Sequence, residues 1–158
     1  MYFDDFEANA RATKLVENFQ YIDSAVASIL GIPSQFSVDP KATAFFKEEI
    51  QNDPITLSKR LIEINSKSLD MIKNYYGANN ETYQHLSSSV ASAVIMILNV
   101  PIGEALNMQP KAGLRYQELK NTLFEAKIIL VHLNNDFYFN SEETMKVDMS
   151  LNLINTIL

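Results

Sequence analysis

The chain contains no cysteine and no tryptophan, and it has only four glycines and two histidines among its 158 residues. Without cysteine the protein has no disulfides and no thiolate metal ligands, and nucleophilic cysteine chemistry is excluded. The glycines are isolated and stand at expected helix ends, at Gly31, Gly77, Gly103 and Gly113. A phosphate-binding loop needs several glycines close together, so the sequence disfavours P-loop and Rossmann nucleotide binding.

The small number of histidines restricts histidine-based chemistry to His85 and His132. His85 follows Glu81 by four residues, so both side chains can share one helix face and hold a metal ion. A di-metal helical bundle instead uses Glu-x-x-His motifs on two helices, a spacing that Glu81 and His85 do not have. We therefore favour the interpretation that these two residues lie in a solvent-facing first turn of the helix. For His132, near the end of an apolar helical pattern, a buried or helix-capping role is favoured over catalysis with Asp136. We expect no catalytic residue, no cofactor and no metal.

Basic residues are also few, and the formal net charge is −6. This balance disfavours a general nucleic-acid binder, because neutralising phosphates requires a basic surface. Two segments, 54–77 and 111–134, nevertheless each carry four Lys or Arg residues against two carboxylates. If their helices adjoin, the basic faces of residues 59–73 and 111–127 form a site for an anionic ligand or a nucleic acid. The candidate anion-binding residues are Lys59, Arg60, Lys67, Lys111, Arg115 and Lys120.

The N-terminal segment lacks the features of a secretory signal. Its first residues, MYFDDFEANARATKL, are acidic where a signal peptide is basic, and no apolar run follows them. We therefore expect the protein to be cytoplasmic.

The segment from Leu86 to Val100, LSSSVASAVIMILNV, contains no charged residue. A helix without a polar stripe must be covered on every side. Its unbroken apolar part, Ala93 to Leu98, is much shorter than the roughly 20 residues that cross a bilayer. We predict a core helix at the centre of the fold and no membrane association. Its serines and alanines favour close packing of neighbouring helices, and a ligand pocket beside the serines is the alternative.

The first predicted helix begins at Asp4 or Asp5 and ends at Gly31, before Pro33. Val16 and Leu30 widen its apolar stripe, which favours a multi-helix bundle over a two-stranded coiled coil. The stripe consists of residues at steps of three and four, namely Ala8, Ala12, Leu15, Phe19, Ile22, Val26 and Ile29.

Two Asp-Pro pairs, Asp39-Pro40 and Asp53-Pro54, predict the starts of the next two helices. In each pair aspartate caps the helix and proline occupies its first position, where the missing N–H costs nothing. The first of these helices ends before Asp53, and the second runs to Gly77.

The central helix is predicted to begin near Glu81 and to stop at Pro101, followed by a turn-rich connection over residues 101–113. A regular helix follows from Leu114 to Leu133. It has two apolar rows, the second made by Phe124, Ile128 and Val131, which implies packing partners on two sides.

The C-terminal segment fits two structures. From Met145 to Leu153 apolar and polar residues alternate, which is typical of a strand and predicts a hairpin with residues 137–140. A cap at Ser141 with two glutamates behind it predicts a helix instead. We favour the helix, because an isolated hairpin is marginally stable.

Aromatic residues near the ends of the predicted helices are the candidate partner-binding residues. They are Tyr75, Tyr76, Phe137, Tyr138 and Phe139. Burial in the core of the same chain is the simpler interpretation of such side chains. However, the binding energy of protein interfaces also concentrates in buried aromatic anchors.

Taken together, these patterns predict a single all-α domain over residues 1–158, a compact bundle of five or six helices around a buried central helix. Since no catalytic set converges, we expect a non-enzymatic protein-interaction or assembly protein, such as an inhibitor, a regulator, an immunity-type factor or a structural subunit. Its expected partner is another protein or a second copy in a homo-oligomer. The alternative is a helical bundle that binds a small ligand or nucleic acid through the basic faces.

Overall fold

Residues 5–158, the part of the chain that the computed structural model describes, form six α-helices and one short 3₁₀ helix, with no strands. The elements are α1 (Asp5–Leu30), α2 (Pro40–Asn52), α3 (Pro54–Tyr76), α4 (Glu81–Asn107), α5 (Leu114–His132), η1 (Leu133–Asn135) and α6 (Ser141–Ile157). Helix makes up 83% of the structure, and the helices pack together compactly. The predicted all-α bundle is confirmed.

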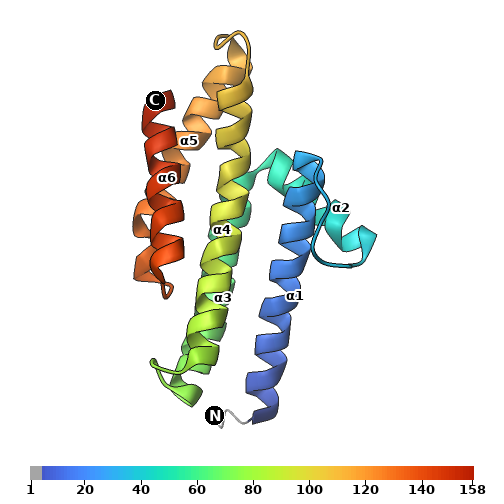
Figure 1. Ribbon diagram of the computed structural model, residues 1–158, viewed down its shortest axis with the longest axis vertical. Coiled ribbons are helices and arrows are strands. Elements are labelled where there is room, and N and C mark those ends of the chain that lie inside the picture. The colour runs from blue at the N-terminus through green and yellow to red at the C-terminus, as the bar shows by residue number, and fades with distance from the viewer. Residues whose placement is uncertain (1–4) are drawn as a thin grey trace.

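The helix α4 lies at the centre of the bundle, with α1 and α6 on opposite sides of it (Figure 1). It packs against α1, α3, α5 and α6, which is why an uncharged segment is stable there. Ser87, Ala91, Val94 and Leu98 are among its fully buried residues, so the predicted core helix is confirmed. Of the described helices, α4 alone is long and apolar enough to cross a membrane. A covered core helix passes the same test, and 67% of the qualifying 18-residue window is buried.

The predicted end of α4 at Pro101 is wrong, because the helix continues through the proline to Asn107. A proline in a helix interior removes one backbone hydrogen bond and costs about 3 kcal/mol. Ile102 and Ala105, which follow it, are both buried in the core. Their burial in helical positions offsets the local cost, and the turn-rich connection is correspondingly shorter than predicted.

The helix starts predicted from the Asp-Pro pairs are confirmed for α2 and α3. The Asp39 side chain accepts a hydrogen bond from the backbone N–H of Lys41, and Pro40 is the first residue of α2. At α3, Asp53 accepts hydrogen bonds from the backbone N–H and the hydroxyl of Thr56, at 3.0 and 2.6 Å. These two bonds stabilise the carboxylate and lower the pKa of Asp53 below 3.8.

The C-terminal segment is the helix α6, so the alternative hairpin is wrong. The capping residue is Asn140, one position before the predicted Ser141. The Asn140 side chain accepts hydrogen bonds from the N–H groups of Glu142 and Glu143, and the Glu143 carboxylate accepts one from the Asn140 N–H. This capping box satisfies three backbone N–H groups at the start of α6.

The long N-terminal helix α1 packs its predicted apolar stripe against the bundle. Ala8, Leu15, Ile22 and Val26 are buried. Val16 and Leu30, which were expected to widen the buried face, are exposed instead. Asp4, one of the two predicted start residues, lies outside the described residues.

Only one of the two apolar rows of α5 is covered. Leu119, Leu123 and Leu130, which belong to the first row, are buried in the core. The second row, Phe124, Ile128 and Val131, is about half exposed, so the packing partner that this row implies is not another helix of the described residues.

Candidate partner-binding groove

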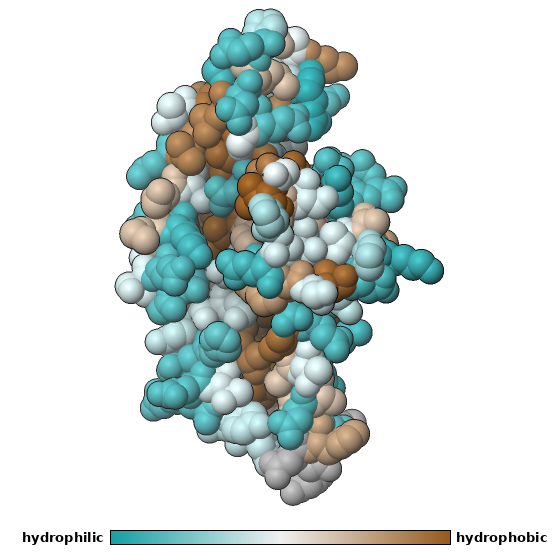
Figure 2. All heavy atoms as spheres, turned by 45° about the vertical axis from the view of Figure 1, so that its right-hand side comes forward, coloured by the Kyte–Doolittle hydropathy of each residue, from teal (hydrophilic) through white to brown (hydrophobic). Residues whose placement is uncertain are grey.

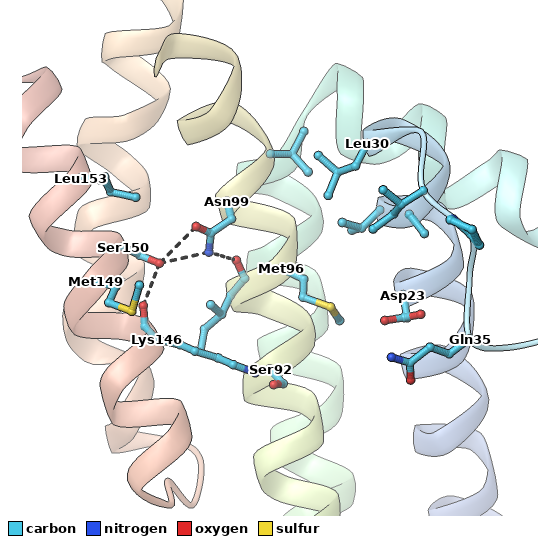
Figure 3. Close-up of a pocket in the computed structure, with 16 residues that line it drawn as sticks. Asp23, Leu30, Gln35, Ser92, Met96, Asn99, Lys146, Met149, Ser150 and Leu153 are labelled. Carbon is cyan, nitrogen blue, oxygen red and sulfur yellow. Dashed lines mark hydrogen bonds between the residues drawn. The ribbon is translucent and has the colours of Figure 1, made fainter. Parts of the chain in front are cut away.

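A groove lies between α1 and α6, and α4 forms its floor (Figure 3). Both outer helices pack against α4 but have no extensive packing against each other, so the α4 surface between them stays open. The groove has a volume of about 400 Å³. It is lined by Asp23, Val26, Ala27, Leu30, Ile32, Pro33 and Gln35 from α1 and the following loop, by Ser92, Ile95, Met96, Asn99 and Val100 from α4, and by Lys146, Met149, Ser150 and Leu153 from α6. We call this site the α1/α4/α6 groove.

The α1 wall of the groove is apolar near the helix end. Leu30 and the loop residue Ile32 are more than half exposed, although both are large aliphatic side chains. The chain leaves the helix at Gly31, whose φ of 71° is in the left-handed region that glycine adopts without strain. A backbone hydrogen bond of 3.0 Å from the Ile32 N–H to the Ala27 carbonyl then folds the loop back onto the helix end. Leu30 and Ile32 are thereby held beside the groove.

The floor and the α6 wall are joined by a polar contact. Asn99 donates hydrogen bonds from Nδ2 to the Ile95 carbonyl at 2.7 Å and to the Ser150 hydroxyl at 3.0 Å. The Ser150 hydroxyl in turn donates to the Lys146 carbonyl at 2.9 Å (Figure 3). Both polar side chains are therefore used within the chain, where they fix α6 against α4. The surface that they leave for a ligand is mainly that of Met96, Met149 and Leu153.

The surface of this protein carries a continuous apolar region. In Figure 2, hydrophobic residues form a band along the middle of the face, with hydrophilic residues on either side. Large contiguous apolar patches on a folded chain mark binding sites more often than scattered apolar residues do.

Asp23 is the acidic residue of the groove, on the α1 wall opposite Lys146. Burial raises the pKa of its carboxyl above 3.8, because the partly buried carboxylate has lost part of its hydration. Lys146 is paired within α6 instead, with its Nζ 3.0 Å from a Glu142 carboxylate oxygen. No ion pair among the described residues involves Asp23. The groove therefore presents an uncompensated negative charge on its α1 wall.

The raised pKa predicts a specific pH dependence for Asp23→Asn. A carboxyl whose pKa is higher in the folded than in the unfolded state makes folding less favourable as pH rises through that interval, and the cost is fully present above it. The variant should thus have a higher free energy of unfolding than the wild type at neutral pH. The difference should disappear well below pH 3.8, where the carboxyl is fully protonated in both states. Urea unfolding at the two pH values measures this, and an equal difference at both would contradict it.

The predicted aromatic residues are divided between the core and the surface. Phe137 is buried in the core, and Tyr76 and Phe139 pack partly buried against it. Tyr75 and Tyr138 are each 38% exposed. The Tyr138 N–H donates a 2.8 Å hydrogen bond to the buried Ser87 hydroxyl, which fixes this loop to α4. Most of this cluster covers one end of the core, and it does not line the α1/α4/α6 groove.

Of the predicted anion-binding residues, those on α5 and the segment before it have partners within the chain. Arg115 makes a two-point ion pair with Glu104, at 2.7 and 2.9 Å, and these hydrogen bonds raise the pKa of its guanidinium. Lys111 donates to the carbonyls of Ala105 and Leu106 near the end of α4, and the Lys120 ammonium lies 5.9 Å from the Tyr116 ring centroid. On α3, Lys59, Arg60 and Lys67 are exposed.

Neither histidine lines the groove. His85 lines a separate shallow cavity between α1 and α4 together with Glu17 and Glu81, and His132 is exposed at the end of α5. Within residues 5–158, no three His, Asp or Glu side chains are grouped so that they could hold a metal ion.

Comparison with protein-family models, with curated proteins and with solved structures found no match for this chain.

Proposed function

We propose that this protein is a non-enzymatic interaction protein that binds a basic amphipathic helix of a partner protein in the α1/α4/α6 groove. The observation that carries the proposal is the groove itself, an open apolar channel with helical walls on both sides and an uncompensated carboxylate on one of them. An amphipathic helix laid into a hydrophobic groove is a recurring mode of peptide recognition.

The dimensions of the groove suit a short helix. On α4 the lining residues Ser92, Met96 and Asn99 span two helical turns, and on α6 Lys146 and Leu153 also lie seven positions apart. Two turns are about 10 Å long, which accommodates apolar anchors at positions i, i+3 or i+4, and i+7 of a bound helix. Met96 and Met149 add flexible, polarizable side chains, which adapt to the shape of the anchors.

Charge favours a basic partner helix over an acidic one. The chain has a net charge of −6, which attracts a cationic segment at long range. At short range, a Lys or Arg at the edge of the bound helix would pair with Asp23 and offset the desolvation that raises its pKa.

The polar groups of the groove support binding in place of catalysis. Asn99 and Ser150 are hydrogen-bonded to each other and to backbone carbonyls, and Lys146 is paired with Glu142. A hydrolytic or acid–base site needs a nucleophile or base whose lone pair is directed at a substrate. Asp23 is the unpaired carboxylate of this cavity, and neither histidine lines the cavity with it to form a catalytic pair.

The test is binding of a synthetic leucine–lysine peptide of about three helical turns, designed to be amphipathic, by isothermal titration calorimetry. Met149→Arg should weaken binding at least tenfold, because it places a charge and a long side chain in the groove and repels the basic peptide. Met145→Arg is the matched control. It is the same substitution one turn earlier on α6, at 57% exposure against 58%, but Met145 does not line the groove. Both variants add the same charge, so only the position differs.

Two further peptides and an apolar dye distinguish the proposed function from its alternatives. A peptide of the same composition scrambled to remove the apolar face, and a leucine–glutamate version, should both bind at least tenfold more weakly. Equal weakening by Met149→Arg and Met145→Arg would show that the peptide binds through general charge attraction, which contradicts the proposal. The groove volume is also within the range of small-molecule sites. Binding of an apolar dye that the leucine–lysine peptide fails to displace would therefore identify a small-ligand site and overturn the helix-binding function.

A further inference from the structure

The exposed apolar row of α5 has the residue pattern of one strand of a coiled coil. Phe124, Ile128 and Val131 follow one another at steps of four and three, and each is about half exposed. Continued towards the start of the helix, the same seven-residue repeat reaches Asn121, Gln117 and Leu114, which are also exposed. In heptad terms Leu114, Asn121 and Ile128 occupy the a positions, and Gln117, Phe124 and Val131 the d positions. We call these six residues the α5 seam.

Opposite charges flank the α5 seam on its two sides. The e positions beside it are Glu118, Glu125 and His132, whereas the g positions include Lys120 and Lys127. Glu118 lies 3.6 Å from Arg115 of its own helix. Glu125 and Lys127 take part in no ion pair among the described residues. The seam is therefore acidic along one edge and basic along the other.

This arrangement of charges favours a second copy of the chain as the partner and a parallel orientation of the two α5 helices. In a parallel pair of helices, a g residue faces the e residue of the following heptad on the other chain, so Lys120 faces Glu125 of a second copy, and the symmetry repeats the contact. In an antiparallel pair, e faces e and g faces g, which opposes glutamate to glutamate and lysine to lysine. The polar Asn121 at an a position is a further feature of parallel two-stranded coiled coils, where it fixes the register.

We propose that the α5 seam is the self-association surface of this protein, where two copies pair through parallel α5 helices. The seam does not line the α1/α4/α6 groove, so the dimer and the groove are independent, and two grooves remain open in the dimer. Because the seam is under three heptads long, the dimer should be weak and concentration-dependent.

Sedimentation equilibrium of the full chain across the micromolar to submillimolar range tests the surface. The wild type should dimerise, and Phe124→Ser should weaken the dimer at least tenfold by removing the central apolar anchor of the seam. Phe45→Ser is the matched control, because Phe45 is a similarly exposed phenylalanine on α2, at 55% against 60%. A wild type that stays monomeric, or equal effects of the two substitutions, would overturn the proposal. Circular dichroism confirms that both variants remain folded.

A charge-exchange experiment tests the parallel orientation. Glu125→Lys and Lys120→Glu should each weaken the homodimer by about tenfold, since each turns two attractive contacts into two repulsive ones. An equimolar mixture of the two variants should dimerise about as tightly as the wild type, because the heterodimer restores both opposite-charge contacts. Single variants that dimerise as well as or better than the wild type would indicate an antiparallel pair or another surface. A mixture without recovery would also contradict the parallel seam.

Discussion

Replacing Leu98 by alanine should lower the free energy of unfolding by about 3 kcal/mol, which is one of the two largest stability effects that we expect in this protein. Leu98 is 0% exposed at the centre of α4, within the main core cluster. Its removal costs the transfer free energy of the lost methyl and methylene groups and leaves a cavity between helices that are held apart by other side chains. A typical domain is stable by only about 5–15 kcal/mol, so the variant should also unfold at a clearly lower urea concentration.

Leu106→Ala is the control for this measurement. Leu106 is on the same helix, past Pro101, and is 38% exposed. Because less of its surface is buried, its replacement should cost about 1 kcal/mol or less. Urea unfolding followed by far-UV circular dichroism gives both values. Similar losses for the two leucines would mean that the middle of α4 is not the covered centre of the fold.

The second large effect is expected from overpacking. Ala91→Leu should lower the free energy of unfolding by about 2 kcal/mol, because Ala91 is fully buried where small side chains let neighbouring helices approach α4 closely. A leucine there forces the helices apart or adopts an unfavourable rotamer.

The neighbouring residue provides the contrast. Ser92 is half-buried and lines the α1/α4/α6 groove, so Ser92→Leu adds the same side chain to an open space. This substitution should change stability by less than about 1 kcal/mol and should weaken binding of the leucine–lysine peptide by filling the groove. Equal destabilisation at the two positions would contradict the assignment of Ser92 to the groove.

Local signals in the sequence predict the helices of this protein well. An aspartate that caps and a proline at the first position act within a single turn, so Asp39-Pro40 and Asp53-Pro54 identify their helix starts without knowledge of the fold. The uncharged stretch of α4 likewise requires cover wherever it is placed. The prediction of a helix end at Pro101 is wrong because the cost of a proline is local, whereas the burial of Ile102 and Ala105 that offsets it comes from distant parts of the chain.

The groove was not predicted from the sequence, although one of its walls left a trace there. The alternation from Met145 to Leu153 resembles a strand because α6 carries apolar residues on more than one face. Val147 is buried against the core, whereas Met149 and Leu153 line the groove. A helix with more apolar residues than one buried face requires is the signal that could have indicated a binding surface. The position of the groove could not be predicted from the sequence, because it depends on how far apart α1 and α6 pack on α4.

The exposed row of α5 was visible in the sequence as a second apolar row, but its surroundings were not. The sequence requires a partner for Phe124, Ile128 and Val131, and only the fold shows that no other helix of the described chain covers them. Similarly, the sequence does not divide Phe137, Tyr138 and Phe139 into core and surface residues. In the fold Phe137 lies in the core, and the Tyr138 N–H donates a hydrogen bond to Ser87.

The most direct test of the helix-binding function is a two-dimensional NMR titration of the isotope-labelled full chain with the leucine–lysine peptide. The largest chemical-shift changes should be at the backbone amides of groove residues on all three helices, represented by Leu30, Met96 and Met149. The amides around Phe124 and Ile128 on α5 should change little, because the peptide does not occupy the α5 seam. Changes that concentrate on α5, or that spread evenly over the acidic surface, would contradict the assignment of the α1/α4/α6 groove as the partner-binding site.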